Sequence, residues 1–214
     1  MSSPTHAVDR LTADPTGRQP RADARRNVER LVAAARTAIA ELGVTASAHE
    51  IAARAGVGVG TFYRRIPSRE ALLLAVLEEV LGEIIALADR ALAEPDPWQG
   101  LCDFAAGYVG LRTESCGICE ALGGVFGEAL DDTLAVLRER FRFLVERAQS
   151  AGVLRTDLTW QDVAFLLASI TAADHTLGLR ATDDQRHRTL RVLLDGLRST
   201  APAASIAAPD CVPN

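Results

Sequence analysis

Lysine is absent from the sequence, so all 23 basic residues are arginine. Aromatic residues are also scarce, at 5% of a chain whose alanine, leucine and arginine favour helices. No apolar run reaches the roughly 18 to 20 residues that cross a bilayer, and the polar start MSSPTHAVDR lacks the apolar segment of a signal peptide. We therefore expect a cytoplasmic protein that does not enter a membrane.

Cysteine is too sparse for a disulfide framework, because Cys102, Cys116, Cys119 and Cys211 are unevenly spread over 214 residues. Cys116-Gly-Ile-Cys119 has no second Cys-x-x-Cys or Cys-x-x-His to complete a metal site. We predict reduced thiols, no metal and no cofactor, and keep a thiol switch or half a zinc site as the alternative for Cys116 and Cys119. No nucleophile motif accompanies a base, so we do not expect an enzyme.

Charge is divided unevenly along the chain. Residues 1–67 hold ten arginines against six acidic residues, a balance of +4, whereas residues 68–214 hold thirteen against twenty-two, a balance of −9. Such asymmetry is more informative than the net charge of −5, because a basic segment attracts anionic partners. The sequence thus predicts a basic head followed by an acidic body.

Apolar residues at three- and four-residue steps predict an all-α fold with about nine helices and no strand. Serine, threonine and aspartate caps and glycine or proline stops set their limits. The expected helices cover residues 22–42, 47–56, 59–65, 68–94, 96–113, 116–122, 130–152, 160–175 and 183–199. We divide the chain into a flexible basic arm (1–21), a three-helix domain (22–67), a larger helical domain (68–199) and a disordered tail (200–214).

The second and third predicted helices form a helix-turn-helix, a unit that places its second helix in the major groove of DNA. Gly56 provides the turn with the positive φ that it needs, and Ala52 is small enough for a close helix crossing. Ile51, Val57 and Phe62 are expected to form a small core with the first helix. The outer side of the helix at 59–65 then remains available for DNA.

The segment EIAARAGVGVGTFYRRIPSREALL resembles the N-terminal signature of the tetracycline-repressor (TetR) family of bacterial transcription regulators. The likeness extends over roughly residues 25–80. It departs from the family at Gly58, where serine is frequent, at Ile66, where phenylalanine is common, and at Arg69, where lysine is usual. For the remainder of the chain the resemblance is one of length and helix number.

The resemblance implies a set of DNA contacts. Ser47, Tyr63 and Arg69 would hold phosphates, and His49 is an additional candidate. Val59, Gly60, Thr61 and Arg64 would face base edges, where Arg64 is suited to guanine. The alternative for Arg64 is a solvated residue at a helix end.

The acidic body is expected to form a dimer with a second copy of the chain and to bind an effector molecule. The resemblance implies a homodimer through the last two helices, which could instead only close the core of one monomer. An apolar effector cavity is predicted in the middle helices, although the alternative for each of these side chains, taken singly, is a place in the core. Its predicted lining is Trp98, Cys102, Phe104, Tyr108, Cys116, Cys119, Leu122, Phe126, Phe141 and Leu167.

These expectations describe a homodimeric repressor that an unknown small apolar effector releases from double-stranded operator DNA. The long helix after Ser68 would connect the cavity with the head, and the effector would act through unequal affinity for two states. Two alternatives stay open: a regulator gated through Cys116 and Cys119, and a small helical enzyme that uses the central cavity.

Overall fold

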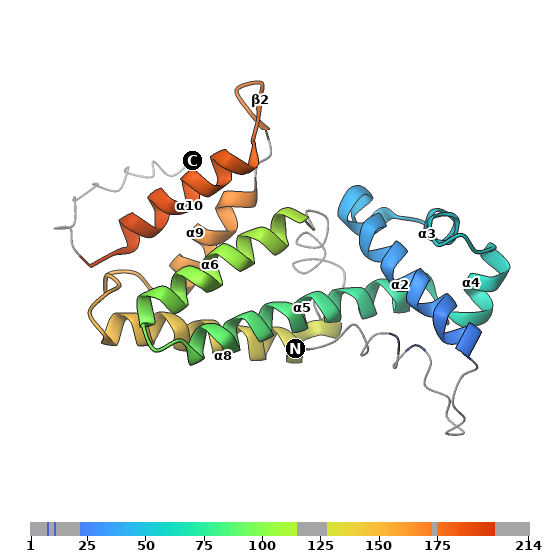
Figure 1. Cartoon of the computed structure of the whole chain (residues 1–214), viewed down its shortest axis with the longest axis horizontal. Coiled ribbons are helices and arrows are strands. Elements are labelled where there is room, and N and C mark those ends of the chain that lie inside the picture. The colour runs from blue at the N-terminus through green and yellow to red at the C-terminus, as the bar shows by residue number, and fades with distance from the viewer. Residues whose placement is uncertain (1–7, 9–10, 12–21, 115–127, 173–174, 200–214) are drawn as a thin grey trace, which may run out of the picture.

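The computed structural model describes residues 22–114, 128–172 and 175–199, together with Val8 and Leu11. These residues are mostly helical, as predicted, and contain eight α-helices (Figure 1). The helices are α2 (Ala22–Leu42), α3 (Ala48–Arg54), α4 (Val59–Arg65), α5 (Arg69–Ala93), α6 (Pro97–Glu114), α8 (Asp131–Ser150), α9 (Trp160–Ala172) and α10 (Asp183–Leu197), with 3-10 turns η1 (Gly43–Thr45) and η2 (Glu128–Leu130). The predicted helix at 116–122 lies outside the described residues.

Helices α2, α3 and α4 form a small bundle at one end of the molecule (Figure 1). Its centre is made of side chains with essentially no exposed surface, among them Leu31, Ile39, Ile51 and Phe62. Because Ile51 and Phe62 are buried against α2, the orientation of α3 and α4 is fixed by apolar packing. Of the predicted arm, the structure describes only Val8, which is buried, and Leu11, which packs against the core.

Helix α5 leaves this bundle and extends under the rest of the molecule (Figure 1). Its N-cap is Ser68, whose hydroxyl accepts a hydrogen bond from the Ala71 N–H at 3.0 Å. Along its length α5 packs against α2, α6 and α8. At Gly107 of α6 a Cβ atom would lie 2.6 Å from a Leu87 methyl carbon, so a larger residue there would require the Leu87 side chain of α5 to move.

Helix α9 ends at Ala172, and the prediction that it continues to residue 175 is wrong. His175 belongs instead to an antiparallel hairpin of two short strands, β1 (His175–Thr176) and β2 (Leu179–Arg180). The turn residues Leu177 and Gly178 both have positive φ, at 50° and 76°, which suits the twist of a two-residue hairpin. The expectation of no strand is therefore corrected by this one hairpin.

No helix in the described parts of the chain is long and apolar enough to cross a membrane.

Candidate nucleic-acid interface and cavity

The turn between α3 and α4 has the hydrogen bonds of a glycine C-cap. The Val57 N–H donates to the Ala52 carbonyl at 3.0 Å, and the Gly56 N–H donates to the Ala53 carbonyl at 3.1 Å. Gly56 has φ +65°, as predicted from the sequence, and Ala52 is fully buried. The pair of helices thus adopts the predicted helix-turn-helix arrangement.

The start of α3 carries the predicted capping box. The Ser47 hydroxyl accepts a hydrogen bond from the Glu50 N–H at 3.2 Å, and the Glu50 carboxylate accepts one from the Ser47 N–H at 2.8 Å. The hydrogen bond from the Ser47 hydroxyl to the same carboxylate lowers the pKa of Glu50, and the Ser47 backbone adds to the effect. An ionised Glu50 therefore belongs to the folded start of this helix.

Helix α4 buries one side and exposes the other. Phe62 has no exposed surface, whereas Gly60, Tyr63, Arg64 and Arg65 are exposed, and Val59 and Thr61 are half-buried. Tyr63 is 59% exposed, and its ring lies edge-on to Phe62 with centroids 5.1 Å apart. The Arg64 guanidinium donates to the Thr61 hydroxyl at 3.2 Å. The structure thus brings the predicted α4 contact residues onto a short, rigidly supported helix.

The remaining predicted DNA contacts lie at the starts of α3 and α5. His49 is exposed in the first turn of α3, two residues after the cap residue Ser47. Arg69 begins α5, where its Nε donates to the Ala46 carbonyl at 2.5 Å and its guanidinium pairs with Glu70 at 3.2 Å. Arg69 therefore also connects α5 to the segment that leads into α3, an intramolecular role that the sequence did not suggest.

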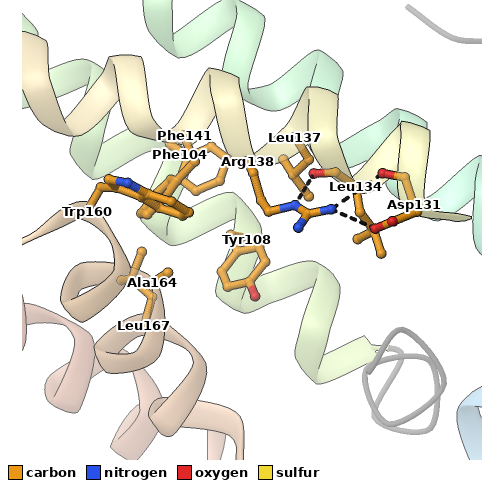
Figure 2. A pocket seen from close by; sticks show the side chains of 10 residues that line it. All are labelled: Phe104, Tyr108, Asp131, Leu134, Leu137, Arg138, Phe141, Trp160, Ala164 and Leu167. Atoms are coloured by element: carbon orange, nitrogen blue, oxygen red, sulfur yellow. Dashed lines mark hydrogen bonds and ion pairs between the residues drawn. The ribbon is translucent and has the colours of Figure 1, made fainter. Parts of the chain in front are cut away.

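A cavity of about 530 Å³ lies between α6, α8 and α9 (Figure 2). Helix α6 contributes Phe104 and Tyr108, whose rings are stacked with centroids 5.7 Å apart, and Phe141 of α8 lies 5.2 Å from Phe104. The size and the mainly apolar lining are typical of sites for small organic molecules. The lining is Phe104, Tyr108, Asp131, Leu134, Leu137, Arg138, Phe141, Trp160, Ala164 and Leu167.

Four of the predicted effector residues, Phe104, Tyr108, Phe141 and Leu167, line this cavity. Trp98 and Cys102 are not in its lining. The Trp98 ring instead packs under the Arg198 guanidinium at 4.5 Å, and burial raises the pKa of the half-buried Cys102 thiol. The other predicted members, Cys116, Cys119, Leu122 and Phe126, lie outside the described residues. Within the described ranges, no three His, Cys, Asp or Glu side chains are placed to hold a metal ion.

The sequence prediction missed six lining residues. Leu134 and Leu137 belong to the recognised apolar stripe of α8, but a stripe does not reveal whether it faces solid core or a cavity. Trp160 begins α9, and Ala164 follows one turn later. The polar members are Asp131 and Arg138 of α8, whose side chains pair at 2.9 Å at one edge of the cavity (Figure 2).

Comparisons with known proteins agree with this architecture. Residues 31–76 match the family described as bacterial regulatory proteins, tetR family, and residues 96–199 match the C-terminal domain described as transcriptional regulator SbtR-like. The chain is 30% identical to the crystal structure of a TetR transcriptional regulator from Streptomyces coelicolor, covering 81% of this chain and 99% of that chain with a TM-score of 0.58. It is 32% identical to a TetR transcription regulatory protein from Mycobacterium vanbaalenii, covering 83% of this chain and 98% of that chain at the same TM-score. A search of curated proteins gives no match.

Proposed function

The chain belongs to the TetR family of DNA-binding transcription regulators, and from that premise we propose that it is a repressor that a small apolar effector releases from its operator. Proteins of this family bind operator DNA, dimerise and are generally not enzymes. The proposal rests on one arrangement in particular: α5 packs against α2 of the head and also against α6 and α8, which line the cavity. We further propose a cytoplasmic location and no catalytic activity.

For DNA binding we propose that α4 enters the major groove. Arg64 and Thr61 face base edges together with Val59 and Gly60, and Arg64 gives up its bond to Thr61 for an acceptor on guanine. Tyr63 donates its exposed hydroxyl to a phosphate. The bare backbone at Gly60 leaves room for close approach, since a Cβ there would meet nothing within 4 Å inside the protein.

Ser47, His49 and Arg69 are proposed to hold the DNA backbone beside this helix. Ser47 and His49 lie at the start of α3, and the Ala46 carbonyl that Arg69 contacts immediately precedes Ser47. The starts of α3 and α5 are therefore joined, which would set three phosphate contacts at a fixed spacing.

For dimerisation we propose the face of α9 and α10 that points away from the cavity. Phe165 is 78% exposed and Val192 is 71% exposed, an unusual state for large apolar side chains, while Leu166 is partly exposed beside Phe165. A second copy would cover these side chains and present two α4 helices to half-sites about one helical turn, or a multiple of it, apart.

The test is a gel shift of the purified protein with the DNA upstream of its own gene, at stated salt concentration. Specific binding to one fragment, lost when an extract of small apolar metabolites is added, supports a repressor of the proposed kind. If no fragment is bound more tightly than random DNA after bound metabolites are removed, the proposal is wrong. If metabolites strengthen binding, the ligand is a corepressor and the release mechanism is wrong.

A further inference from the structure

The cavity between α6, α8 and α9 is chemically one-sided. Trp160, Phe104, Phe141 and Leu167 surround one part of it, whereas Arg138 and Asp131 lie together toward the other end, beside Leu134 and Leu137 of the same helix (Figure 2). A molecule that fills both parts must therefore have an apolar body and one polar end. The question is which charge that polar end carries.

The Arg138 side chain forms its hydrogen bonds within its own helix, α8. Its Nε donates to the Leu134 carbonyl at 3.1 Å, and its terminal nitrogen donates to the Asp131 carboxylate at 2.9 Å and to the Asp131 carbonyl at 3.4 Å. The side chains are 53% and 72% exposed for Arg138 and Asp131, so their ion pair is a weak one that an incoming group can replace. The guanidinium also has a fork of donors that fits a carboxylate in a bidentate manner.

A second guanidinium lies next to the cavity. Arg112 donates to the hydroxyl of the lining residue Tyr108 at 3.2 Å and to Thr171 of α9 at 2.7 Å. Its central carbon is 5.6 Å from the centre of the Tyr108 ring. Two arginines therefore reach the cavity, Arg138 as a lining residue and Arg112 through its contact with Tyr108, whereas Asp131 is the one carboxylate among the lining residues, a balance that favours an anionic ligand over a cationic one.

We propose that the cavity binds an amphipathic monocarboxylate, whose apolar body lies among the aromatic side chains and whose carboxylate replaces Asp131 as the partner of Arg138. This inference rests on the cavity being the effector site and refines the proposed function, because the effector is then apolar over most of its length but ends in one carboxylate. The exchange moves no covalent bond and leaves the exposed Asp131 side chain in contact with solvent at the start of α8.

The proposal can be tested by isothermal titration calorimetry of the full-length protein without DNA, using decanoate, decanol and decylamine as probes. Decanoate should bind about tenfold more tightly than decanol, the order expected for a charge-assisted hydrogen bond. Arg138→Gln should abolish this preference, and Asp131→Asn should strengthen decanoate binding several-fold by removing the competing carboxylate. Arg142→Gln is the matched control, because Arg142 lies on the same helix, pairs with Glu146 at 3.1 Å and does not line the cavity.

Equal binding of decanoate and decanol, a preference that survives Arg138→Gln, tighter binding of decylamine, or no binding of any probe would each overturn the proposal. Circular dichroism shows whether each variant is folded. If Arg138→Gln does not fold, the effect of Asp131→Asn on decanoate binding tests the proposal independently. Because no DNA is present, this failure is distinguishable from failure of the repressor function, which the gel shift measures separately.

Discussion

Gly56 and Gly60 show how one residue type serves two purposes in the same helix-turn-helix. A Cβ at either position would meet nothing within 4 Å, so neither position requires glycine for lack of room. Gly56 has φ +65°, which costs other residues about 1 to 2 kcal/mol, whereas Gly60 is helical and alanine there is favoured by up to about 1 kcal/mol.

We predict that Gly56→Ala lowers the free energy of unfolding by about 1 kcal/mol, while Gly60→Ala leaves it unchanged or raises it. Gly60→Ala should nevertheless weaken operator binding, because the added methyl group keeps the backbone away from the base edges. Urea unfolding and fluorescence anisotropy on the two variants measure these quantities. Operator affinity that is unaffected by Gly60→Ala would remove Gly60 from the interface.

Tyr63 and Arg64 are neighbours with different predicted tasks. Tyr63→Phe should weaken binding equally for all operator sequences and leave the salt dependence unchanged, because tyrosine is neutral. Arg64→Ala should in addition relax the preference at one base pair by about 1 to 3 kcal/mol and lower the salt slope by about one. Binding measured over a set of single-base operator variants separates the two. Arg90→Ala, an exposed arginine near the end of α5, is the control, and an unchanged base preference in Arg64→Ala would contradict the assignment.

Helices α3 and α10 both begin with a capping box, but only the box of α3 contains an ionisable group. In α3 the box is Ser47 with Glu50, and in α10 it is Thr182 with Gln185. The Glu50 pKa is lowered in the folded chain, so its contribution is complete above the pKa of the unfolded state and is lost as the pH falls through the folded-state pKa. Gln185 does not titrate. The hydrogen bond from the Ser47 N–H to Glu50 should therefore weaken in acid, whereas the one from the Thr182 N–H to Gln185 should not.

Hydrogen exchange of the Ser47 and Thr182 amides over a descending pH series, corrected for intrinsic rates, checks this prediction. Ser47→Ala and Thr182→Ala should each cost about 1 kcal/mol of stability, but only Ser47→Ala should also weaken operator binding. Equal acid sensitivity of the two helix starts would contradict the assigned role of Glu50.

The helices were predictable because their signals are local. Periodic apolar residues and caps such as Ser47 and Ser68 placed the helix limits of the described residues to within a few positions, and the last helix, expected to open at Asp183, is capped by Thr182. The hairpin at 175–180 was not predicted, because two-residue strands have no periodicity and its turn uses Leu177, which rarely adopts positive φ.

The lining of the cavity was predictable only in part, with four of its ten residues named from the sequence, and for a different reason. Hydrophobic periodicity shows which side of a helix is buried, but not whether three such sides meet tightly or leave a space. Phe104 and Phe141 were predicted as part of an apolar cavity in the middle helices, whereas Trp160 and Arg138 line the cavity only because α9 and α8 are placed as they are. Trp98 was part of the same prediction and packs beside Arg198 instead.

Assembly of two chains should depend on the exposed apolar side of α9 and α10. We predict that Phe165→Asp converts the dimer to a monomer and weakens operator binding by more than tenfold, because a single head contacts only one half-site. Sedimentation velocity measures the oligomeric state. Val136→Asp, at an exposed apolar residue of α8, should leave the dimer intact. A dimer that persists in Phe165→Asp would place the interface elsewhere.

Helix α5 packs against α2 of the head and against α6 and α8, which line the cavity, so we propose that communication between cavity and head passes along α5. Arg36 of α2 forms a two-pronged ion pair with Glu83 of α5, at 2.5 and 2.7 Å. A second pair, Arg140 with Asp89 at 2.8 Å, joins α5 only to α8. Both pairs are part-exposed, so each should contribute less than about 1 kcal/mol to stability.

The two ion pairs should differ in how far they couple effector binding to operator binding, although they are similarly exposed. A tilt of α5 that a bound effector favours reaches the α4 helices only if the head moves with it, and Glu83→Gln loosens that attachment. We predict that Glu83→Gln reduces the effector's influence on operator affinity several-fold, out of a typical coupling of about 1 to 3 kcal/mol, and leaves effector binding itself unchanged. Asp89→Asn should keep full coupling. The coupling is measured by titrating each variant with operator DNA, with and without effector. An equal loss of coupling in the two variants would contradict the prediction. It would mean that the head moves through the general packing of α5 and not through the attachment of α5 to α2.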